Sequence, residues 1–483
     1  MSGRKKRKVD LPLLEKVEIL DAGAEGKAVA RVDNMVVFVP FAAPGDVVDI
    51  KVVSKKKSFY EGKIVKYHHL SEKRVEPRCE HFGLCGGCKW QHLGYEHQLF
   101  FKQKQVVDNF TRIGKLTLPP FNPIIASEEQ YFYRNKLEFS FSNRKWLLEN
   151  KIIQDTPPNA NGLGMHLPGM YDRIVDLENC YLQAEPSNSI RLALRDWGIL
   201  NNLTFYDSRV HRGFLRTATI RTSSTGETMV IIAFGANETE QITALLDHLL
   251  EQFPQITSLF YVVNPKHNDT INDLEIQHYS GKNYIVEKME DLNFKVGPLS
   301  FYQTNSRQAL RLYQVVREFA GFEGHETVYD LYCGTGTITN FIAKRVGKVI
   351  GVEYIPEAID DAIENSKMNR IGNTRFVVGD IAETLNEQFV SEHGKPQMII
   401  TDPPRAGMHP KVIQQLLNIE PQKIVYVSCN PATQARDIAL LAEKYVLEQI
   451  QPVDMFPQTH HVENVSLLVR KFPIQEQLVK PML

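Results

Sequence analysis

An alternation of short apolar runs with helical patterns, from about residue 293 onward, most constrains the fold of this chain. Strand-like runs at 327–331 and 349–352 are followed by the helical patterns 338–346 and 356–369. Further strand-like runs follow at 375–378, 397–401, 423–428, 446–453 and 465–469. Such alternation predicts βαβ units and a doubly wound parallel sheet, an α/β fold that binds ligands at the carboxyl ends of its strands.

The first of these strands leads into a glycine-rich loop, Asp330-Leu331-Tyr332-Cys333-Gly334-Thr335-Gly336. Its glycines let the backbone approach a ligand, and the helix that follows offers free N–H groups. Thr339 occupies the third glycine position of the dinucleotide pattern, and no Gly-Lys-Ser/Thr follows. Glu353 ends the next strand, where a carboxylate accepts ribose hydroxyls, and Asp380 follows the third strand. The set resembles the S-adenosylmethionine site of Rossmann-like methyltransferases.

The composition of the chain is that of a globular protein with an uneven charge. Its 483 residues suffice for about three domains. The net charge is -1, but residues 1–70 carry 14 Lys and Arg against 9 Asp and Glu. The basic run at 1–8 is read as a solvated tail, a nucleic-acid-binding arm or a nuclear signal. With no apolar span and no secretory signal, we expect a cytoplasmic protein without a membrane segment.

The N-terminal residues read as short strands punctuated by glycine and proline. Runs at 16–20, 34–40 and 46–53 predict a small five-stranded barrel of the OB type within residues 9–70. The stretch 55–60, Lys-Lys-Lys-Ser-Phe-Tyr, places charges beside aromatic rings, as single-stranded nucleic-acid sites do. Phe59 and Tyr60 are equally well explained as barrel core.

The middle of the chain is predicted to be mostly β. Residues 95–113 have helical spacing, whereas residues 125–292 read mainly as strands, interrupted by one amphipathic helix at 242–253. Between the barrel and the first helix lie Cys79, Cys85 and Cys88, and Cys180 is the only other cysteine outside the C-terminal domain. Four thiolates suit zinc or an iron–sulfur cluster, and their spacing leaves both open; with zinc, His81 and His92 are alternative ligands.

Three chemically reactive side chains end or begin strands of the C-terminal domain. Asp402 opens Asp-Pro-Pro-Arg after one strand, Cys429 follows the next, and Glu463 precedes the last. Because strand ends meet at one edge of a sheet, a thiol and two carboxylates are expected to converge there. A thiol at this edge is a candidate nucleophile rather than a buried packing residue.

These motifs resemble the RNA uracil-5-methyltransferase family over nearly the whole chain. The resemblance is carried by Ser-Phe-Tyr-Gln-Thr-Asn at 300–305, by Asp402-Pro403-Pro404-Arg405 and by Ser428-Cys429-Asn430-Pro431. It implies a TRAM-type RNA-binding barrel at 9–70 and a mostly β central domain at 71–92 and 125–292. The Rossmann-like S-adenosylmethionine-dependent methyltransferase domain would comprise residues 93–124 and 293–474.

The resemblance also implies residue roles. Cys429 would add to C6 of uracil, Glu463 would remove the C5 proton, and Asp402 would contact the uracil or the cofactor. The residues implied to line S-adenosylmethionine are Gln303, Tyr332, Gly334, Gly336, Glu353, Asp380 and Asp402. In the ribosomal branch the cysteine pattern holds a [4Fe-4S] cluster, here on Cys79, Cys85, Cys88 and Cys180. Tyr133-Arg134-Asn135-Lys136 resembles a segment near the RNA.

The expected activity is therefore methylation at C5 of a uridine in 23S ribosomal RNA, with the target base flipped out of its stack. Ribosomal RNA is the expected partner, with no membrane and no required protein partner. Two alternatives stay open: the same reaction on transfer RNA, and a non-catalytic RNA-binding assembly factor.

Overall fold

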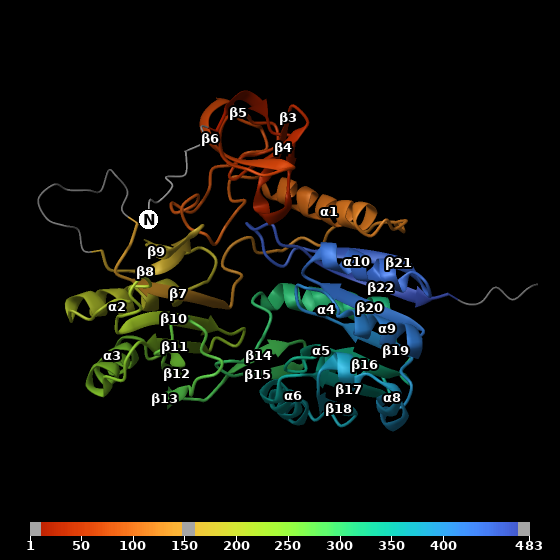
Figure 1. Ribbon diagram of the computed structural model, residues 1–483. Coiled ribbons are helices and arrows are strands. Elements are labelled where there is room, and N and C mark those ends of the chain that lie inside the picture. Colours follow the sequence, from red (N-terminus) through yellow and green to blue (C-terminus); the bar gives the residue numbers. More distant parts are fainter. Residues whose placement is uncertain (1–10, 147–159, 472–483) are drawn as a thin grey trace, which may run out of the picture.

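The computed structural model describes residues 11–146 and 160–471, so the basic run at 1–8 lies outside the described residues. Figure 1 shows the N-terminal sheet at the top, the central domain on one side below it and the C-terminal domain on the other. Helix α1 (Tyr95–Arg112) lies between the N-terminal sheet and the C-terminal domain.

The C-terminal domain contains the predicted doubly wound sheet. Seven strands lie in the order β18-β17-β16-β19-β20-β22-β21, and the first five are parallel. The last two form the predicted antiparallel pair. The strands are β16 (Thr327–Leu331), β17 (Lys348–Glu353), β18 (Thr374–Val378), β19 (Met398–Thr401), β20 (Lys423–Ser428), β21 (Tyr445–Val453) and β22 (Glu463–Arg470).

Two hydrophobic cores cover the faces of this sheet. On one face pack α4 (Ser306–Ala320) and α5 (Thr337–Ala343), with the hairpin β14 (Ile285–Met289) and β15 (Leu292–Val296). On the other face pack α1, α9 (Pro410–Ile419) and α10 (Pro431–Leu441). The remaining helices are α6 (Pro356–Met368), α7 (Ile381–Thr384) and α8 (Glu387–His393). The domain boundary expected at 292 thus falls inside the hairpin.

The N-terminal sheet has six strands in the order β1-β5-β6-β4-β3-β2 around a core of small and β-branched residues. Tyr60 packs against this core under Lys55, and Phe59 meets Phe38 edge to face, with both aromatic residues half-buried. The strands are β1 (Leu13–Glu18), β2 (Asp21–Ala22), β3 (Ala28–Val32), β4 (Met35–Val39), β5 (Val47–Lys55) and β6 (Phe59–His69), with the short 3-10 helix η1 (Ala24–Gly26).

The central domain is a seven-stranded sheet, β13-β12-β11-β10-β7-β8-β9, with two helices packed on it. Helix α3 (Thr239–Gln252) was expected, but helix α2 (Ser187–Leu200) lies where the sequence pattern predicted strands, so that prediction was wrong. Ile190 and Leu194 face the core one turn apart, and Arg191 between them is also buried, which hides the helical period. The strands are β7 (Lys136–Ser142), β8 (Gly162–Leu167), β9 (Met170–Asp176), β10 (Leu215–Thr222), β11 (Thr228–Phe234), β12 (Ile256–Val263) and β13 (Gln277–Gly281).

Candidate active site and cysteine site

The antiparallel pairing of β20 with β22 brings the thiol and the carboxylate together. Ser428, the last residue of β20, pairs with Asn464, so Cys429 and Glu463 are neighbours at the next position of the two strands. Burial raises the pKa of Cys429 to about 11, and the charges of Glu463 and Asp402 add to this effect. The two residues therefore lie on the same side of the sheet edge and within electrostatic reach of each other.

Glu463 is a buried carboxylate with little to stabilise its charge. Its pKa is raised to about 8, mainly by burial and also by the charge of Asp402, and only Arg405 opposes this. Among the residues that the structure describes, its carboxylate has no hydrogen-bond partner. A carboxylate with a pKa near neutrality is suited to act as a general base.

Asp402 and Asp330 form a second pair of carboxylates beneath the same edge. Burial raises the pKa of Asp402 to about 7, and the charge of Asp330 contributes. Asp330 is itself fully buried, its pKa is raised to about 7 by burial, and one oxygen accepts the Thr339 hydroxyl at 2.6 Å. The other oxygen of Asp330 has no partner among the described residues. Asp330 had no predicted role, although its place at the end of the first strand was a usable signal.

The glycine-rich loop has the backbone needed for close approach by a ligand. Tyr332, Gly334 and Gly336 all have positive φ, at 64°, 52° and 73°. A Cβ at Gly334 would meet no atom within 4 Å, so the space above this residue is open. A Cβ at Gly336 would lie 2.8 Å from the Cβ of Ala362 on α6, which explains this glycine by packing.

Two of the remaining predicted cofactor residues lie around this loop, and Gln303 contacts the central domain. Glu353 accepts the Gly334 N–H at 3.2 Å and the Tyr354 N–H at 2.9 Å. Burial raises the pKa of Tyr332 to about 12, and the charges of Asp380 and Glu353 contribute, which places all three in one neighbourhood. Asp380 is exposed and caps α7. Gln303 lies before α4, and its carbonyl accepts the Asn135 side chain at 2.9 Å.

The segment 133–136, predicted to lie near the RNA, contacts the loop before β22. Tyr133 is buried, and its hydroxyl donates to Pro457 O at 2.9 Å, whereas the Arg134 guanidinium lies 5.2 Å from the ring centre of Phe456. Asn430 Nδ2 donates to Arg405 O at 2.9 Å and so ties the Cys429 loop to the Asp402 loop.

The four predicted cysteine ligands form a separate neighbourhood. Burial raises the pKa of all four thiols, to about 11 for Cys85 and about 12 for Cys88, and the charges of the other cysteines contribute for Cys79, Cys85 and Cys88. N–H groups aimed at the sulfurs oppose this: those of His81 and Phe82 at Cys79, Gly87 at Cys85, and Leu182 and Gln183 at Cys180. Such donors stabilise ligating thiolates.

The Nε2 atoms of the two alternative histidine ligands make contacts outside the cysteine group, whereas His92 Nδ1 has no partner among the described residues. His81 Nε2 accepts the Glu178 N–H at 3.0 Å, and His92 Nε2 lies 3.2 Å from Ala42 O. Within the described ranges, no three cysteine sulfurs lie within 4.8 Å of one another. Among the residues that the structure describes, the one group of three such donors that close is Glu323, His325 and Glu326, of which two are exposed. No helix of the described part of the chain is both long and apolar enough to cross a membrane.

Comparisons with known proteins agree with this geometry. Residues 277–471 match the model of the tRNA (uracil-5-)-methyltransferase family, and residues 15–65 match the TRAM domain. A protein of Bacteroides thetaiotaomicron, named an uncharacterized RNA methyltransferase, is 53% identical over 449 residues, covering 92% of this chain and 99% of the relative. One from Chlorobaculum tepidum, also named an uncharacterized RNA methyltransferase, is 39% identical, covering 89% of this chain and 90% of the relative.

Among solved structures, a tRNA (uracil-54, C5)-methyltransferase of Pyrococcus abyssi in complex with S-adenosyl-L-homocysteine superposes with a TM-score of 0.73. It is 28% identical, and the match covers 94% of this chain and all of that chain.

Proposed function

Because this chain belongs to the RNA uracil-5-methyltransferase family, we propose that it methylates C5 of a specific uridine in 23S ribosomal RNA through a covalent enzyme–uracil adduct. The coarser statement, that it is an S-adenosylmethionine-dependent RNA methyltransferase, follows from its family. The observation that carries the proposal is the pairing of Cys429 with Glu463 at adjacent strand positions, with Asp402 at the same edge.

The residues divide the reaction into an addition step and an elimination step. S-adenosylmethionine supplies an electrophilic methyl group, and the electrons of its S–CH3 bond stay on the sulfur, which leaves as the neutral thioether S-adenosylhomocysteine. The Cys429 thiolate adds to C6, and the electrons of the C5=C6 bond move onto C5 and the O4 carbonyl, so that C5 can accept the methyl group. Glu463 then takes the proton from C5, and the electrons of that C–H bond restore C5=C6 and expel the Cys429 thiolate. Arg405, which lowers the pKa of Cys429, supports the thiolate.

The cofactor is proposed to lie over the open space at Gly334. Glu353 and Asp380 would face its nucleoside, Tyr332 and Gly336 would shape the loop beneath it, and Gln303 would close the side toward α4. Asp402 would face the reacting end. Two carboxylates with raised pKa values and a single nearby arginine suit a positively charged sulfonium.

The four cysteines are proposed to hold a [4Fe-4S] cluster. Zinc binds thiolates at about 2.3 Å, so its four sulfurs lie within roughly 4 Å of one another. The charges of the cysteines raise one another's pKa values, which supports a shared site, and the choice of a cluster over zinc rests on the resemblance of the cysteine motif. Iron and sulfide analysis of anaerobically purified protein tests this. Reduced thiol ligands and an RNA substrate support a cytoplasmic location.

Transfer RNA is the second candidate substrate, because the superposed Pyrococcus abyssi enzyme is a transfer-RNA methyltransferase that covers 94% of this chain. The extent of the match therefore does not separate the two RNAs; the ribosomal assignment rests on the resemblance of the cysteine motif. Mass mapping of 5-methyluridine in both RNAs from a strain lacking the protein decides. Loss from 23S RNA alone is expected, loss from transfer RNA alone selects the second candidate, and loss from neither favours the non-catalytic assembly factor.

A further inference from the structure

The loop that leads into Glu463 accepts hydrogen bonds from four distant segments of the chain. It joins β21 to β22, and five consecutive carbonyls of this loop each accept a hydrogen bond from another segment. The donors are Gln308 Nε2 to Asp454 O (2.8 Å), Asn305 Nδ2 to Met455 O (3.0 Å), Lys102 Nζ to Phe456 O (3.0 Å), Tyr133 Oη to Pro457 O (2.9 Å), and the Lys89 and Trp90 N–H groups to Gln458 O (2.9 and 3.0 Å).

The last of these contacts comes from the cysteine loop. Lys89 and Trp90 directly follow Cys88, the most buried of the four cysteines, and Gln458 stands five residues before Glu463. A ligand thiol and the candidate base are thus separated by two short stretches of chain and one pair of backbone hydrogen bonds.

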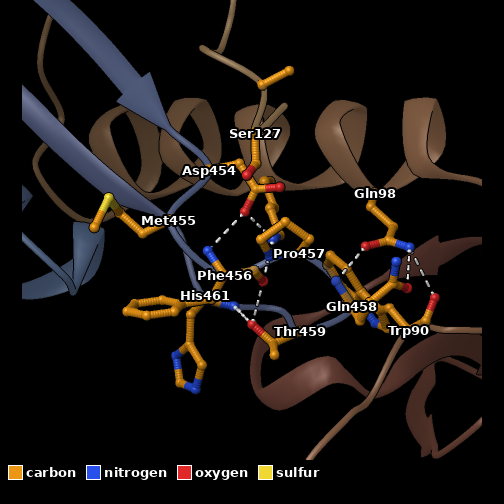
Figure 2. Close-up of polar contacts among 12 residues, drawn as sticks. Trp90, Gln98, Ser127, Asp454, Met455, Phe456, Pro457, Gln458, Thr459 and His461 are labelled. Atoms are coloured by element: carbon orange, nitrogen blue, oxygen red, sulfur yellow. Dashed lines mark hydrogen bonds and ion pairs between the residues drawn. The ribbon is translucent and has the colours of Figure 1, made fainter. Parts of the chain in front are cut away.

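Gln98 of α1 binds both sides of this junction, the contact of Lys89 and Trp90 with Gln458. It is 1% exposed, and its Nε2 lies 2.8 Å from Leu93 O, 3.1 Å from Trp90 O and 3.0 Å from Gln458 Oε1. Its Oε1 accepts the Gln458 N–H at 2.9 Å. One buried amide therefore binds both the cysteine loop and the loop before Glu463, as Figure 2 shows.

The two catalytic groups differ in their dependence on this junction. Cys429 lies in the turn between β20 and α10, where Ser428 Oγ accepts the Asn430 N–H at 3.1 Å and Asn430 binds Arg405 O. Glu463 has no hydrogen-bond partner for its carboxylate among the described residues, so its placement depends on its backbone, which the sheet holds on one side and the loop from Gln458 enters on the other. A disturbance at Gln458 is expected to reach the base before the nucleophile.

We propose that Gln98 is a positioning residue for proton removal: it holds the cysteine loop and Gln458 together, so that ligation at Cys88 sets the placement of Glu463. The inference rests on the proposed covalent mechanism. If Glu463 is misplaced, Cys429 still adds to C6 and C5 still receives the methyl group, but the C5 proton stays and the methylated adduct cannot release the enzyme.

The test compares Gln98→Leu with Gln105→Leu, a half-buried glutamine of the same helix without a hydrogen bond among the described residues. Gln98→Leu is expected to lower kcat about 10- to 100-fold, with the KM values for RNA and S-adenosylmethionine within about twofold. The denaturation-resistant, methyl-labelled protein–RNA complex is expected to accumulate severalfold. Gln105→Leu should match the wild type in every respect.

A double-mutant cycle tests the link to the cysteine site. Cys88→Ala is expected to accumulate the same methylated adduct, and its combination with Gln98→Leu should add little, because both act on one junction. Full additivity of the two effects overturns the link.

Gln458→Met keeps the backbone contacts of this loop and is the second variant. If Gln98→Leu loses adduct formation and has a lower melting temperature while Gln458→Met behaves like the wild type, the role of Gln98 is merely structural. Wild-type kinetics in both Gln98→Leu and Gln458→Met also overturns the inference. If the wild-type protein itself forms no adduct with ribosomal or transfer RNA, the proposed mechanism fails instead.

Discussion

Buried carboxylates in this protein fall into two groups with opposite surroundings. In the TRAM domain, burial raises the pKa of Asp46, but Arg74 and the N–H groups of Ala43 and Ser71 outweigh it, and the pKa ends below its ordinary value. In the loop before β22, Asp454 meets Lys102 Nζ at 2.6 Å and the Tyr95 hydroxyl at 2.9 Å. At the catalytic edge, burial raises the pKa of Glu463 to about 8 with only Arg405 opposing. Burial is common to all three, so the partner decides whether a carboxylate holds the fold or remains available for chemistry.

The carboxylates at the catalytic edge have little positive charge near them, and Arg405 is the one cation that lowers the pKa of Glu463. Asp330 and Asp402 raise the pKa values around them, and no lysine lies among the groups that influence Asp402. A sulfonium substrate would supply the missing charge, so the comparison ties the electrostatics of the edge to the cofactor.

The largest effect is expected from removing the proposed nucleophile of the catalytic group. Cys429→Ala removes the sulfur that must bond to C6, and methylation of RNA is expected to fall on the order of 10⁴-fold or more. Transfer of labelled methyl groups to bulk RNA measures this. Cys333→Ala, at a buried cysteine of the same domain that packs under Gly351, serves as the control and should retain activity. Substantial methylation by Cys429→Ala would exclude the covalent route.

The next effect removes the base and spares the nucleophile. Glu463→Gln keeps the shape of the side chain but cannot take the C5 proton, so turnover is expected to fall about 10²- to 10⁴-fold. The methylated protein–RNA adduct should accumulate, as seen on denaturing gels. A variant that turns over slowly without accumulating adduct would assign Glu463 to an earlier step.

A third experiment breaks the paired group. Lys102 and Asp454 are both fully buried, so Lys102→Met leaves an uncompensated carboxylate and is expected to lower the free energy of unfolding by about 3–5 kcal/mol. Urea denaturation measures it. Adding Asp454→Asn should recover much of the loss, because the amide is neutral. The exposed pair Lys411 and Glu383 is the control, where Lys411→Met should leave the urea midpoint unchanged.

The smallest expected effect is a change in S-adenosylmethionine affinity with pH. Because the pKa of Asp402 is raised to about 7, this group is protonated at lower pH and ionises as pH rises through 7. A sulfonium binds the ionised form better, so S-adenosylmethionine should bind up to about tenfold more weakly at pH 6 than at pH 8. Calorimetric titration tests this, and Asp402→Asn should flatten the dependence. Weaker binding at the higher pH contradicts the assignment.

The sequence predicted the C-terminal sheet best, for a physical reason. Its parallel strands are covered on both faces, so they read as continuous apolar runs, and 327–331 and 423–428 coincide with β16 and β20. Helix α2 was missed because the buried Arg191 breaks its apolar period. Among the proposed site residues, Cys429, Asp402 and Glu463 could be singled out from the sequence because each borders such a strand.

The contacts that hold the site could not be found in this way. Lys102 and Asp454 are 352 residues apart, and Gln98 and Gln458 are 360 apart, so no local period relates them. Each is an ordinary polar residue in its own stretch of chain, and only the packed fold shows that it is buried and paired. Asp330 was overlooked because it lies within the apolar strand 327–331, next to a loop whose glycines drew the interpretation.

The antiparallel register of β20 and β22 has one more consequence. Because adjacent strands hold Cys429 and Glu463, the sheet sets the backbone spacing of the pair, and the contacts at Gln458 bear on the course of the chain into Glu463. A change at those contacts would therefore move the carboxylate while the backbone of the pair stays in register.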